Sequence, residues 1–379
     1  MIIRPVAISD LAALRDIAVE SGPGFTSLVD DHDFLTQKIA RSVASFAADQ
    51  TGGQPGDQSY LFVLIDPDTG NVMGTTGIEA SVGKRRPLYH YRVGHAVRRS
   101  PQPGPGRRQQ TLTLVSHYTG CSEICTLFLR PQYRRAWAGK LLSRVRFLFM
   151  AQHPRRFART VIAEMRGVSD QTGDSPFWHW LQANFVDLDF ATVNQMVGTG
   201  DNGFIADLMP EHPLYTHLMD DSARAVIGQV HPDTRPALHM LESEGFRYTG
   251  FIDPFDGGPT VEAPLARLQS VQRSACCRVR IGPEQSPSLA AWTNGGQGKT
   301  LMVANNSTAD FRATVTSAAR HLPAHQILEI PPSLAYSLGL ENGADVWFAD
   351  LDAGRDQSQN PALVANRQSI PVKEALSAY

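Results

Sequence analysis

The sequence predicts an α+β protein in which helices flank strands, with a small β-rich subdomain at its C-terminal end. Strand-like and helix-like segments alternate from residue 2 to about residue 252, and residues 326–351 have the pattern strand, short helix, Gly343 turn, strand. Of the 379 residues, 42% are hydrophobic and 19% are charged, which is enough apolar material for a sizeable core. A chain of this length is expected to form two domains, or one large domain with an extension.

The first elements follow from local patterns. Residues 2–6 predict a strand, and a helix with apolar residues at helical spacing follows an N-cap at Ser9 or Asp10. Gly22, Pro23 and Gly24 end that helix, and residues 33–46 predict a second, amphipathic one.

A hairpin and a basic loop come next. Residues 60–65 and 72–80 are rich in β-formers and enclose a turn at 66–71 that contains Asp and Gly, so they predict a hairpin. Residues 98–110 combine prolines with four arginines and predict a solvated, mobile loop.

The middle of the chain alternates again. Residues 112–116 and 122–129 predict strands, residues 139–151 a helix, residues 160–165 a strand and residues 176–184 a Trp-rich helix.

A helix at 236–245, ended by Gly245, and a strand at 246–252 close this part. The pattern of residues changes near residue 268. We therefore place a domain at 1–267, with a second lobe from about residue 186, and a C-terminal extension at 268–379.

Charge and composition exclude several classes of protein. The net charge of −2 and the pI near 6.6 give no overall attraction to nucleic acid or anionic lipid, so neither a nucleic acid nor a membrane is expected as a partner. The sequence has no run of about 18 apolar residues, so no membrane span is expected. The four cysteines lack metal-ligand spacing, so no metal is expected, and their reduced state would fit a cytoplasmic protein.

Two apparent ligand motifs fail on inspection. Gly298-Lys299-Thr300 resembles a phosphate loop, but that motif needs glycine where the chain has Thr293. The Asp66 turn resembles a calcium loop, but its twelfth position is Gly77 rather than glutamate.

The segment 125–142 carries the chemistry. It predicts an apolar strand, a loop that contains Arg134 and Arg135, and a helix that small residues, Ala138 and Gly139, open. Outward-pointing amides, the helix dipole and the two arginines suit a diphosphate group, and the strand edge suits an amide-bearing arm such as pantetheine.

In context this order of elements resembles the Gcn5-related N-acetyltransferase fold, a mixed sheet flanked by helices that binds acyl-CoA at its fourth strand and the following loop. More specifically, the chain resembles the bacterial arginine N-succinyltransferases over residues 2–265. The resemblance rests on ordered blocks, among them S-E-I-C-T-L-F-L at 122–129, A-E-M-R-G at 163–167, S-P-F-W at 175–178, F-I-A-D-L-M-P at 204–210, I-G-Q-V-H-P at 227–232 and D-G-G-P-T at 256–260.

The resemblance implies transfer of succinyl from succinyl-CoA to the α-amine of L-arginine, the first step of an arginine catabolic route. It implies that Leu127 contacts succinyl-CoA and that His231 is the proton donor. We add Leu129, Arg134 and Gly139 as expected cofactor-binding residues, from their place in the strand, loop and helix.

The substrate demands complementary charges. An arginine or backbone donors suit its α-carboxylate, and a carboxylate suits its guanidinium. Glu164 and Arg166 alternate with apolar residues on the strand after the coenzyme helix, and they are the first candidates, with Glu123 and Asp256 as further acids.

One departure keeps alternatives open. The acetyltransferase loop has the pattern [RQ]-x-x-G-x-[GA], whereas this chain has Trp137 in place of the first glycine. A non-catalytic partner or sensor subunit with this fold therefore remains an alternative. Because some members of the resembled family work as paired subunits with broader substrate choice, a succinyltransferase for ornithine or another basic amino acid remains another alternative, as do homo- and hetero-oligomers.

Overall fold

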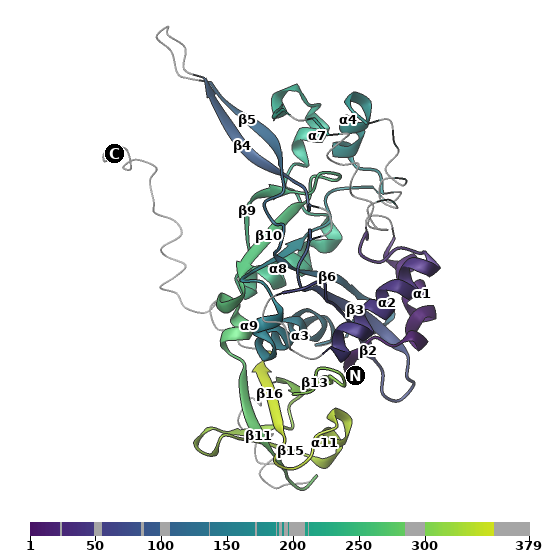
Figure 1. Ribbon diagram of the computed structural model, residues 1–379, viewed down its shortest axis with the longest axis vertical. Coiled ribbons are helices and arrows are strands. Elements are labelled where there is room, and N and C mark those ends of the chain that lie inside the picture. The colour runs from purple at the N-terminus through teal and green to yellow at the C-terminus, as the bar shows by residue number, and fades with distance from the viewer. Residues whose placement is uncertain are drawn as a thin grey trace, which may run out of the picture.

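The computed structural model describes residues 1–22, 25–48, 55–84, 87–98, 107–135, 137–170, 173–186, 188, 192, 196, 209–210, 212–284 and 300–351. Within these residues the strands form a 16-stranded mixed sheet that runs the length of the elongated molecule (Figure 1). The helices are α1 (Leu11–Ser21), α2 (His32–Ala47), α3 (Ala138–Gln152), α4 (Pro176–Asn184), α7 (Asp221–Ala225), α8 (Arg235–Glu244), α9 (Gln269–Gln272) and α11 (Pro332–Leu338).

Most strands are antiparallel to their neighbours, in the order β14-β15-β11-β16-β12-β13-β1-β2-β3-β6-β7-β10-β9-β4-β5-β8. Their bounds are β1 (Ile2–Pro5), β2 (Ser59–Ile65), β3 (Val72–Glu79), β4 (His90–Arg98), β5 (Arg107–Val115), β6 (Ser122–Leu129), β7 (Thr160–Glu164), β8 (Leu214–Tyr215), β9 (Arg247–Ile252), β10 (Pro259–Pro264), β11 (Ala275–Ile281), β12 (Leu301–Asn305), β13 (Ala313–Thr316), β14 (Arg320–Leu322), β15 (Ile327–Ile330) and β16 (Asp345–Asp350). The predicted α+β class is confirmed.

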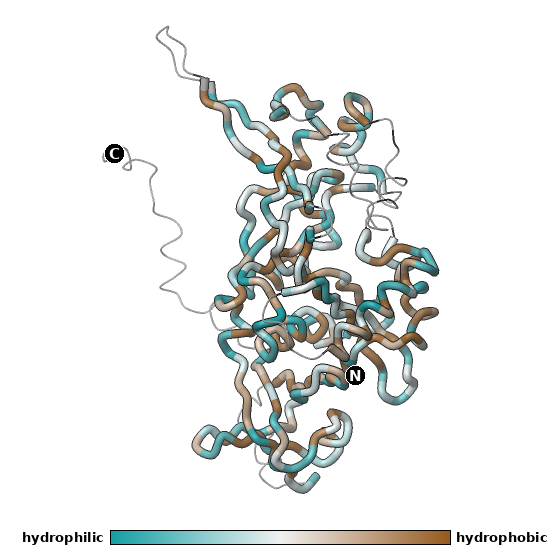
Figure 2. Tube along the Cα trace, in the orientation of Figure 1, coloured by the Kyte–Doolittle hydropathy of each residue, from teal (hydrophilic) through white to brown (hydrophobic). Residues whose placement is uncertain are grey.

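Helices cover both faces of the sheet around β2. Leu61 and Val63 pack in one core with α1 and α2, whereas Phe62 and Leu64 pack in another with α3. This is the alternation expected of a strand buried on both sides. Figure 2 shows hydrophobic and hydrophilic residues alternating along α1 and α2, whose apolar faces lie on the sheet.

One local expectation was wrong, and another was confirmed. The predicted basic loop at 98–110 is in part the outer end of a hairpin, because β4 and β5 pair from His90↔Val115 to Arg98↔Arg107 and project from the body (Figure 1). Residues 99–106 lie outside the described part. Asp10 is at the predicted helix N-cap, but its side chain instead binds Arg4 and the amide of Ala7.

The C-terminal strands continue the same sheet. The predicted strand, helix, turn and strand at 326–351 are present as β15, α11, Gly343 at φ 84° and β16. Ile3 of β1 pairs with Ala313 of β13, so the first strand of the chain joins the two parts of the sheet.

Candidate functional site

The parallel strands β6 and β7 pair only at their beginnings. The register pairs Ser122 with Val161 and Glu123 with Ile162, and residues 124–129 of β6 have no described partner on β7. We call the place where the two strands part the fork. Strands that part in this way leave backbone amides and carbonyls without ladder partners, which suits an extended, amide-bearing ligand.

Thr126 marks a strained point of β6 beside the fork. Its φ is 54°, in the left-handed region that a β-branched residue rarely adopts, and the pairing of β3 with β6 shifts register here. A Cβ on Gly77 of β3 would lie 3.3 Å from Cys125 Sγ and from Thr126 Oγ1. Such a conformation costs on the order of 1–3 kcal/mol and occurs often at functional sites.

Helix α3 begins next to the open end of β6. Its first turn is closed by the amide of Leu141, which donates to the carbonyl of Trp137 at 2.8 Å. A Cβ on Gly139 would meet only Leu129 Cδ2, at 4.0 Å, so the protein itself leaves room in front of this glycine. The N-terminus of a helix with open space before it suits a phosphate.

Trp137 takes the backbone conformation of the glycine that it replaces. Its φ is 72°, and its half-buried indole packs on the main core with Lys140 Nζ 4.7 Å above the ring. The substitution thus leaves the turn into α3 in a glycine-like conformation.

The predicted cofactor-binding residues gather around this end of β6. Leu127 and Leu129 are half-buried and pack against the main core, and Leu129 contacts the Gly139 region. Arg134 is exposed in the loop between β6 and α3.

His231 lies at the far side of the fork, beside the end of β7. Its amide donates to the carbonyl of Arg166 at 2.9 Å, and Gly167 pairs with Val230, so Arg166 and His231 are directly opposite each other. Opposite residues of an antiparallel pair point to the same face, so both side chains lie on one side of the sheet.

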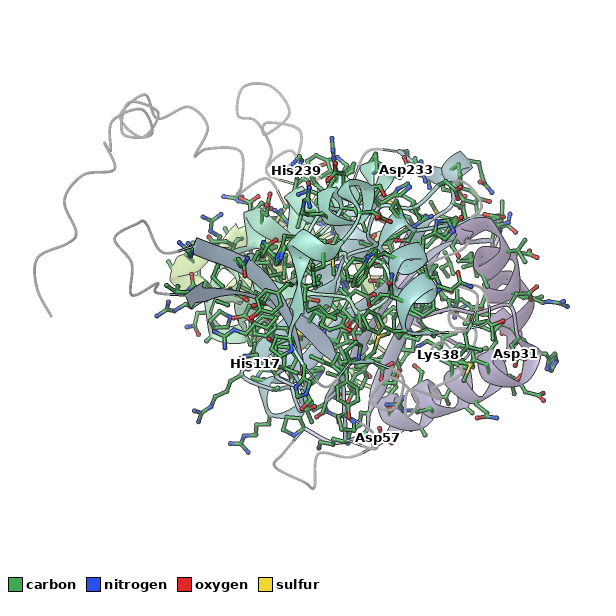
Figure 3. All side chains as sticks on the ribbon, turned by 90° about the horizontal axis from the view of Figure 1, so that it is seen from above. Asp31, Lys38, Asp57, His117, Asp233 and His239 are labelled. Atoms are coloured by element: carbon green, nitrogen blue, oxygen red, sulfur yellow. The ribbon has the colours of Figure 1, made fainter. Side chains whose placement is uncertain are left out.

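Asp233 approaches the imidazole of His231 with two groups. Its amide lies 3.2 Å from Nδ1, which accepts the hydrogen bond, and its Oδ2 lies 3.8 Å from Nδ1. The imidazole is largely buried, whereas Asp233 is exposed at the edge of the molecule (Figure 3). A ring whose Nδ1 accepts this hydrogen bond carries its proton on Nε2.

Two acids lie on the face of the sheet that points away from α3. Ile124, Val161 and Ala163 belong to the core that α3 covers, so their alternating neighbours Glu123 and Glu164 face the other way. Glu164 Oε1 lies 2.8 Å from Nε2 of the fully buried His90 on β4.

The pKa of Glu123 is raised well above its usual value, first by burial and then by the charges of Glu164 and Glu79, with Lys38 opposing them. Glu79 already has cationic partners, because Arg41 lies 2.9 Å and Lys38 3.6 Å from its carboxylate. This part of the fork is therefore an environment that favours an incoming cation.

Arg166 and Asp256 differ in whether their polar side-chain atoms have hydrogen-bond partners within the protein. The guanidinium of Arg166 donates to Ser169 Oγ at 3.0 Å, but its buried Nε has no partner, and burial lowers its pKa. Asp256 accepts from the amides of Gly167 at 2.6 Å and Gly258 at 2.8 Å. Asp256 therefore holds two backbone segments together, and we leave it out of the substrate-binding residues.

Other features are separate from the fork. A cavity of about 560 Å³ lies against α4 and α7, and its lining contains none of the predicted site residues. Within the described ranges, no three His, Cys, Asp or Glu side chains are placed to hold a metal ion. In the same ranges, no helix has the length and apolarity needed to span a bilayer.

Sequence reasoning missed Thr126, His90, Asp233 and Arg146 of α3. Arg146 had a visible signal, because it interrupts the apolar segment 145–150 one helical turn after Leu142. The φ of Thr126 and the proximity of His90 to Glu164 had none, since each depends on neighbours far along the chain.

Comparisons with known proteins agree with this geometry. A family model described as "Arginine N-succinyltransferase beta subunit" matches residues 1–270, and the model of its C-terminal domain matches residues 289–350. An arginine N-succinyltransferase of Salmonella typhi is 43% identical over 317 residues, which is 84% of this chain and 89% of that protein. One from Enterobacter sp. (strain 638) is 44% identical over 314 residues, or 83% and 88% of the two chains.

A solved structure is also similar. Subunit AI of the arginine/ornithine succinyltransferase from Pseudomonas aeruginosa matches with a TM-score of 0.82 at 33% identity, over 92% of this chain and 98% of that one.

Proposed function

The chain belongs to the arginine N-succinyltransferase family, and from this premise we propose how its residues divide the reaction. As an arginine N-succinyltransferase it is an acyltransferase of arginine catabolism. We propose that succinyl-CoA is the acyl donor, that its pantetheine arm lies at the fork, and that Leu127 and Leu129 contact it. Its diphosphate would lie before Gly139, with Arg134 adding positive charge.

The observation that carries this proposal is the pairing of His231 with Arg166 at the end of β7. It brings a histidine that is remote in sequence to the strand that borders the fork. The helix N-terminus before Gly139 and the strained Thr126 support the same location for the coenzyme from the β6 side.

We propose His231 as the proton donor. The unprotonated α-amine of arginine attacks the thioester carbonyl, a C–N bond forms, and the C–S bond breaks with its electron pair on sulfur. Nε2, which carries the ring proton while Nδ1 accepts the amide of Asp233, gives that proton to the sulfur. The proton released by the new amide nitrogen returns to Nε2, so the products are N2-succinyl-L-arginine and CoA.

Charges at the fork support the acceptor's orientation. We propose that Glu164, aided by Glu123, binds the guanidinium of L-arginine and that Arg166 binds its α-carboxylate. This arrangement would direct the α-amine towards the thioester.

The test uses His231→Gln and His231→Ala in steady-state assays with succinyl-CoA and arginine. Loss of general acid catalysis lowers kcat by about 10²–10⁴-fold with little change in either KM. His239→Gln on the neighbouring helix α8 is the control and keeps wild-type kcat. Full turnover by both His231 variants would show that this histidine is not the donor.

Ornithine is a second acceptor to consider, because the similar Pseudomonas structure is titled an arginine/ornithine succinyltransferase. Comparing kcat/KM for arginine, ornithine and lysine separates a guanidinium-specific enzyme from one that accepts basic amino acids in general. The matching family is described as a beta subunit and the similar Pseudomonas protein as subunit AI, which supports assembly with another copy or another subunit. Light scattering on the purified protein would measure this assembly.

We propose a cytoplasmic location. Of the described residues, Cys121, Cys125, Cys276 and Cys277 are free thiols, which suits a reducing compartment.

A further inference from the structure

We propose that Arg146 of α3 binds the terminal carboxylate of the succinyl group and so determines the preference for a dicarboxylic acyl donor. This inference rests on the proposed function, because it requires succinyl-CoA at the fork.

Arg146 is a buried cation without an anionic partner. It is 2% exposed, and among the described residues its guanidinium donates only to the carbonyl of Ser143 at 3.0 Å and to Ser143 Oγ at 3.2 Å, both in its own helix. The ring of Phe147 lies 5.7 Å from its guanidinium carbon. In the part of the chain that the structure describes, no carboxylate is within ion-pair distance of it, an arrangement that is costly for a charge removed from water.

The neighbouring ionisable groups do not neutralise this charge. Glu244 is already bound by Arg144 at 2.8 Å and by the amide and hydroxyl of Ser270 at 2.8 and 2.9 Å. Burial raises the pKa of the Cys125 thiol to about 12, so this thiol is neutral at physiological pH. Burial also lowers the pKa of Arg146, to about 10, which still leaves it cationic near pH 7.

The position of Arg146 follows from the way α3 returns along β6. Gly139 lies near Leu129, and Leu142 contacts the β3–β6 pair at Gly74. Arg146 is one helical turn beyond Leu142, on the same helix face that packs on the β3–β6 pair. It therefore reaches the fork from the α3 side.

The charges on the two sides of the fork are opposite. Glu123 and Glu164 face away from α3 and would repel a second carboxylate, whereas Arg146 approaches from α3. A donor whose diphosphate lies at the start of α3 can direct its acyl carboxylate to Arg146 while the cationic acceptor binds on the acidic side. An arginine is well suited to this task because its planar guanidinium can bind a carboxylate through two hydrogen bonds.

The test is the ratio of kcat/KM for succinyl-CoA to kcat/KM for butyryl-CoA, an acyl donor of similar length without the carboxylate. In Arg146→Met we expect kcat/KM for succinyl-CoA to fall by about 10²-fold or more, and that for butyryl-CoA to stay within about threefold or to rise. A purely structural arginine would lower both values equally, and an unchanged ratio would overturn the inference.

Two further variants distinguish loss of carboxylate binding from loss of folding. Arg146→Lys keeps the charge but not the two-pronged geometry, so the ratio should take an intermediate value. Ser143→Ala, which removes only the internal hydrogen bond to the serine hydroxyl, should keep the wild-type ratio. If the wild-type protein does not use succinyl-CoA with any basic amino acid, the proposed function fails. If it does but Arg146→Lys also keeps the wild-type ratio, only the present inference fails.

Discussion

The charged side chains of the proposed site lie on different faces of the sheet. Glu123 and Glu164 lie on the face away from α3, and His231 and Arg166 lie opposite each other at the end of β7. The proposed roles match Glu123 and Glu164 with the guanidinium of arginine, and Arg166 with its α-carboxylate. The residue-scale prediction concerns Glu123, a buried acid whose pKa is raised well above its usual value.

Glu123→Gln should alter how stability depends on pH. Burial and neighbouring acids raise the pKa of Glu123 in the folded protein, so the folded state binds this proton more tightly than the unfolded chain does. Stability therefore falls as pH rises from the unfolded pKa of about 4.3 towards the raised value. We expect the Tm of Glu123→Gln to fall less than that of the wild type between about pH 5 and about pH 8.

The same variant tests the substrate role of Glu123, because the KM for arginine should rise while that for succinyl-CoA does not. Glu242→Gln, on the exposed side of α8, is the control and should keep the wild-type pH dependence. Equal Tm slopes in the wild type and Glu123→Gln would contradict the effect on stability.

At the scale of elements, the coenzyme site depends on the junction of β6 with α3. The junction combines a left-handed residue at Trp137, a helix N-terminus and a glycine with open space in front of it. Gly139 itself is not needed for packing, because among the described residues a Cβ there would have only one contact, at 4.0 Å.

Gly139→Ala separates stability from coenzyme binding. Alanine in a helix is favoured over glycine, so the free energy of unfolding should rise by about 0.5–1 kcal/mol. The added methyl group occupies the space proposed for the diphosphate, so the KM for succinyl-CoA should rise about tenfold, equivalent to about 1.4 kcal/mol. The KM for arginine is the internal control and stays constant; an unchanged KM for succinyl-CoA would place the diphosphate elsewhere.

At the scale of the whole molecule, the C-terminal part contributes to the core beneath the coenzyme helix. Phe311 is fully buried, with its ring 5.5 Å from that of Phe62 on β2 and 5.2 Å from that of Phe149 on α3. Met302 and Ala313 belong to the same core. We propose that residues 268–379 form an extension that stabilises the domain at 1–267 through this shared core, rather than an independent unit.

Phe311→Ala tests that proposal. Deleting a buried aromatic ring that touches two other elements should lower the free energy of unfolding by about 3–5 kcal/mol in denaturant titrations. Tyr336→Ala, at a position 88% exposed on α11, is the matched control and should change it by less than about 0.5 kcal/mol. Similar values for the two variants would show that the extension does not support the main core.

Local patterns in the sequence located most of the elements. The bounds of β6 and α4 in the structure equal the predicted ranges 122–129 and 176–184, because a strand followed by proline and a helix opened by proline have clear boundaries. The strand β4 was missed, since its alternating residues lie next to a proline-rich and arginine-rich segment that resembles a loop.

Local patterns and ordered blocks of residues were enough to predict the fold class, the strand, loop and helix of the proposed coenzyme site, and the resemblance to the family. Only the tertiary structure brought His231 beside Arg166, His90 beside Glu164 and Arg146 behind β6. The physical reason is the separation of these residues along the sequence. Periodicity and turn chemistry act over a few residues, whereas these contacts join strands and helices that are tens of residues apart. The packing of the whole sheet therefore decides them.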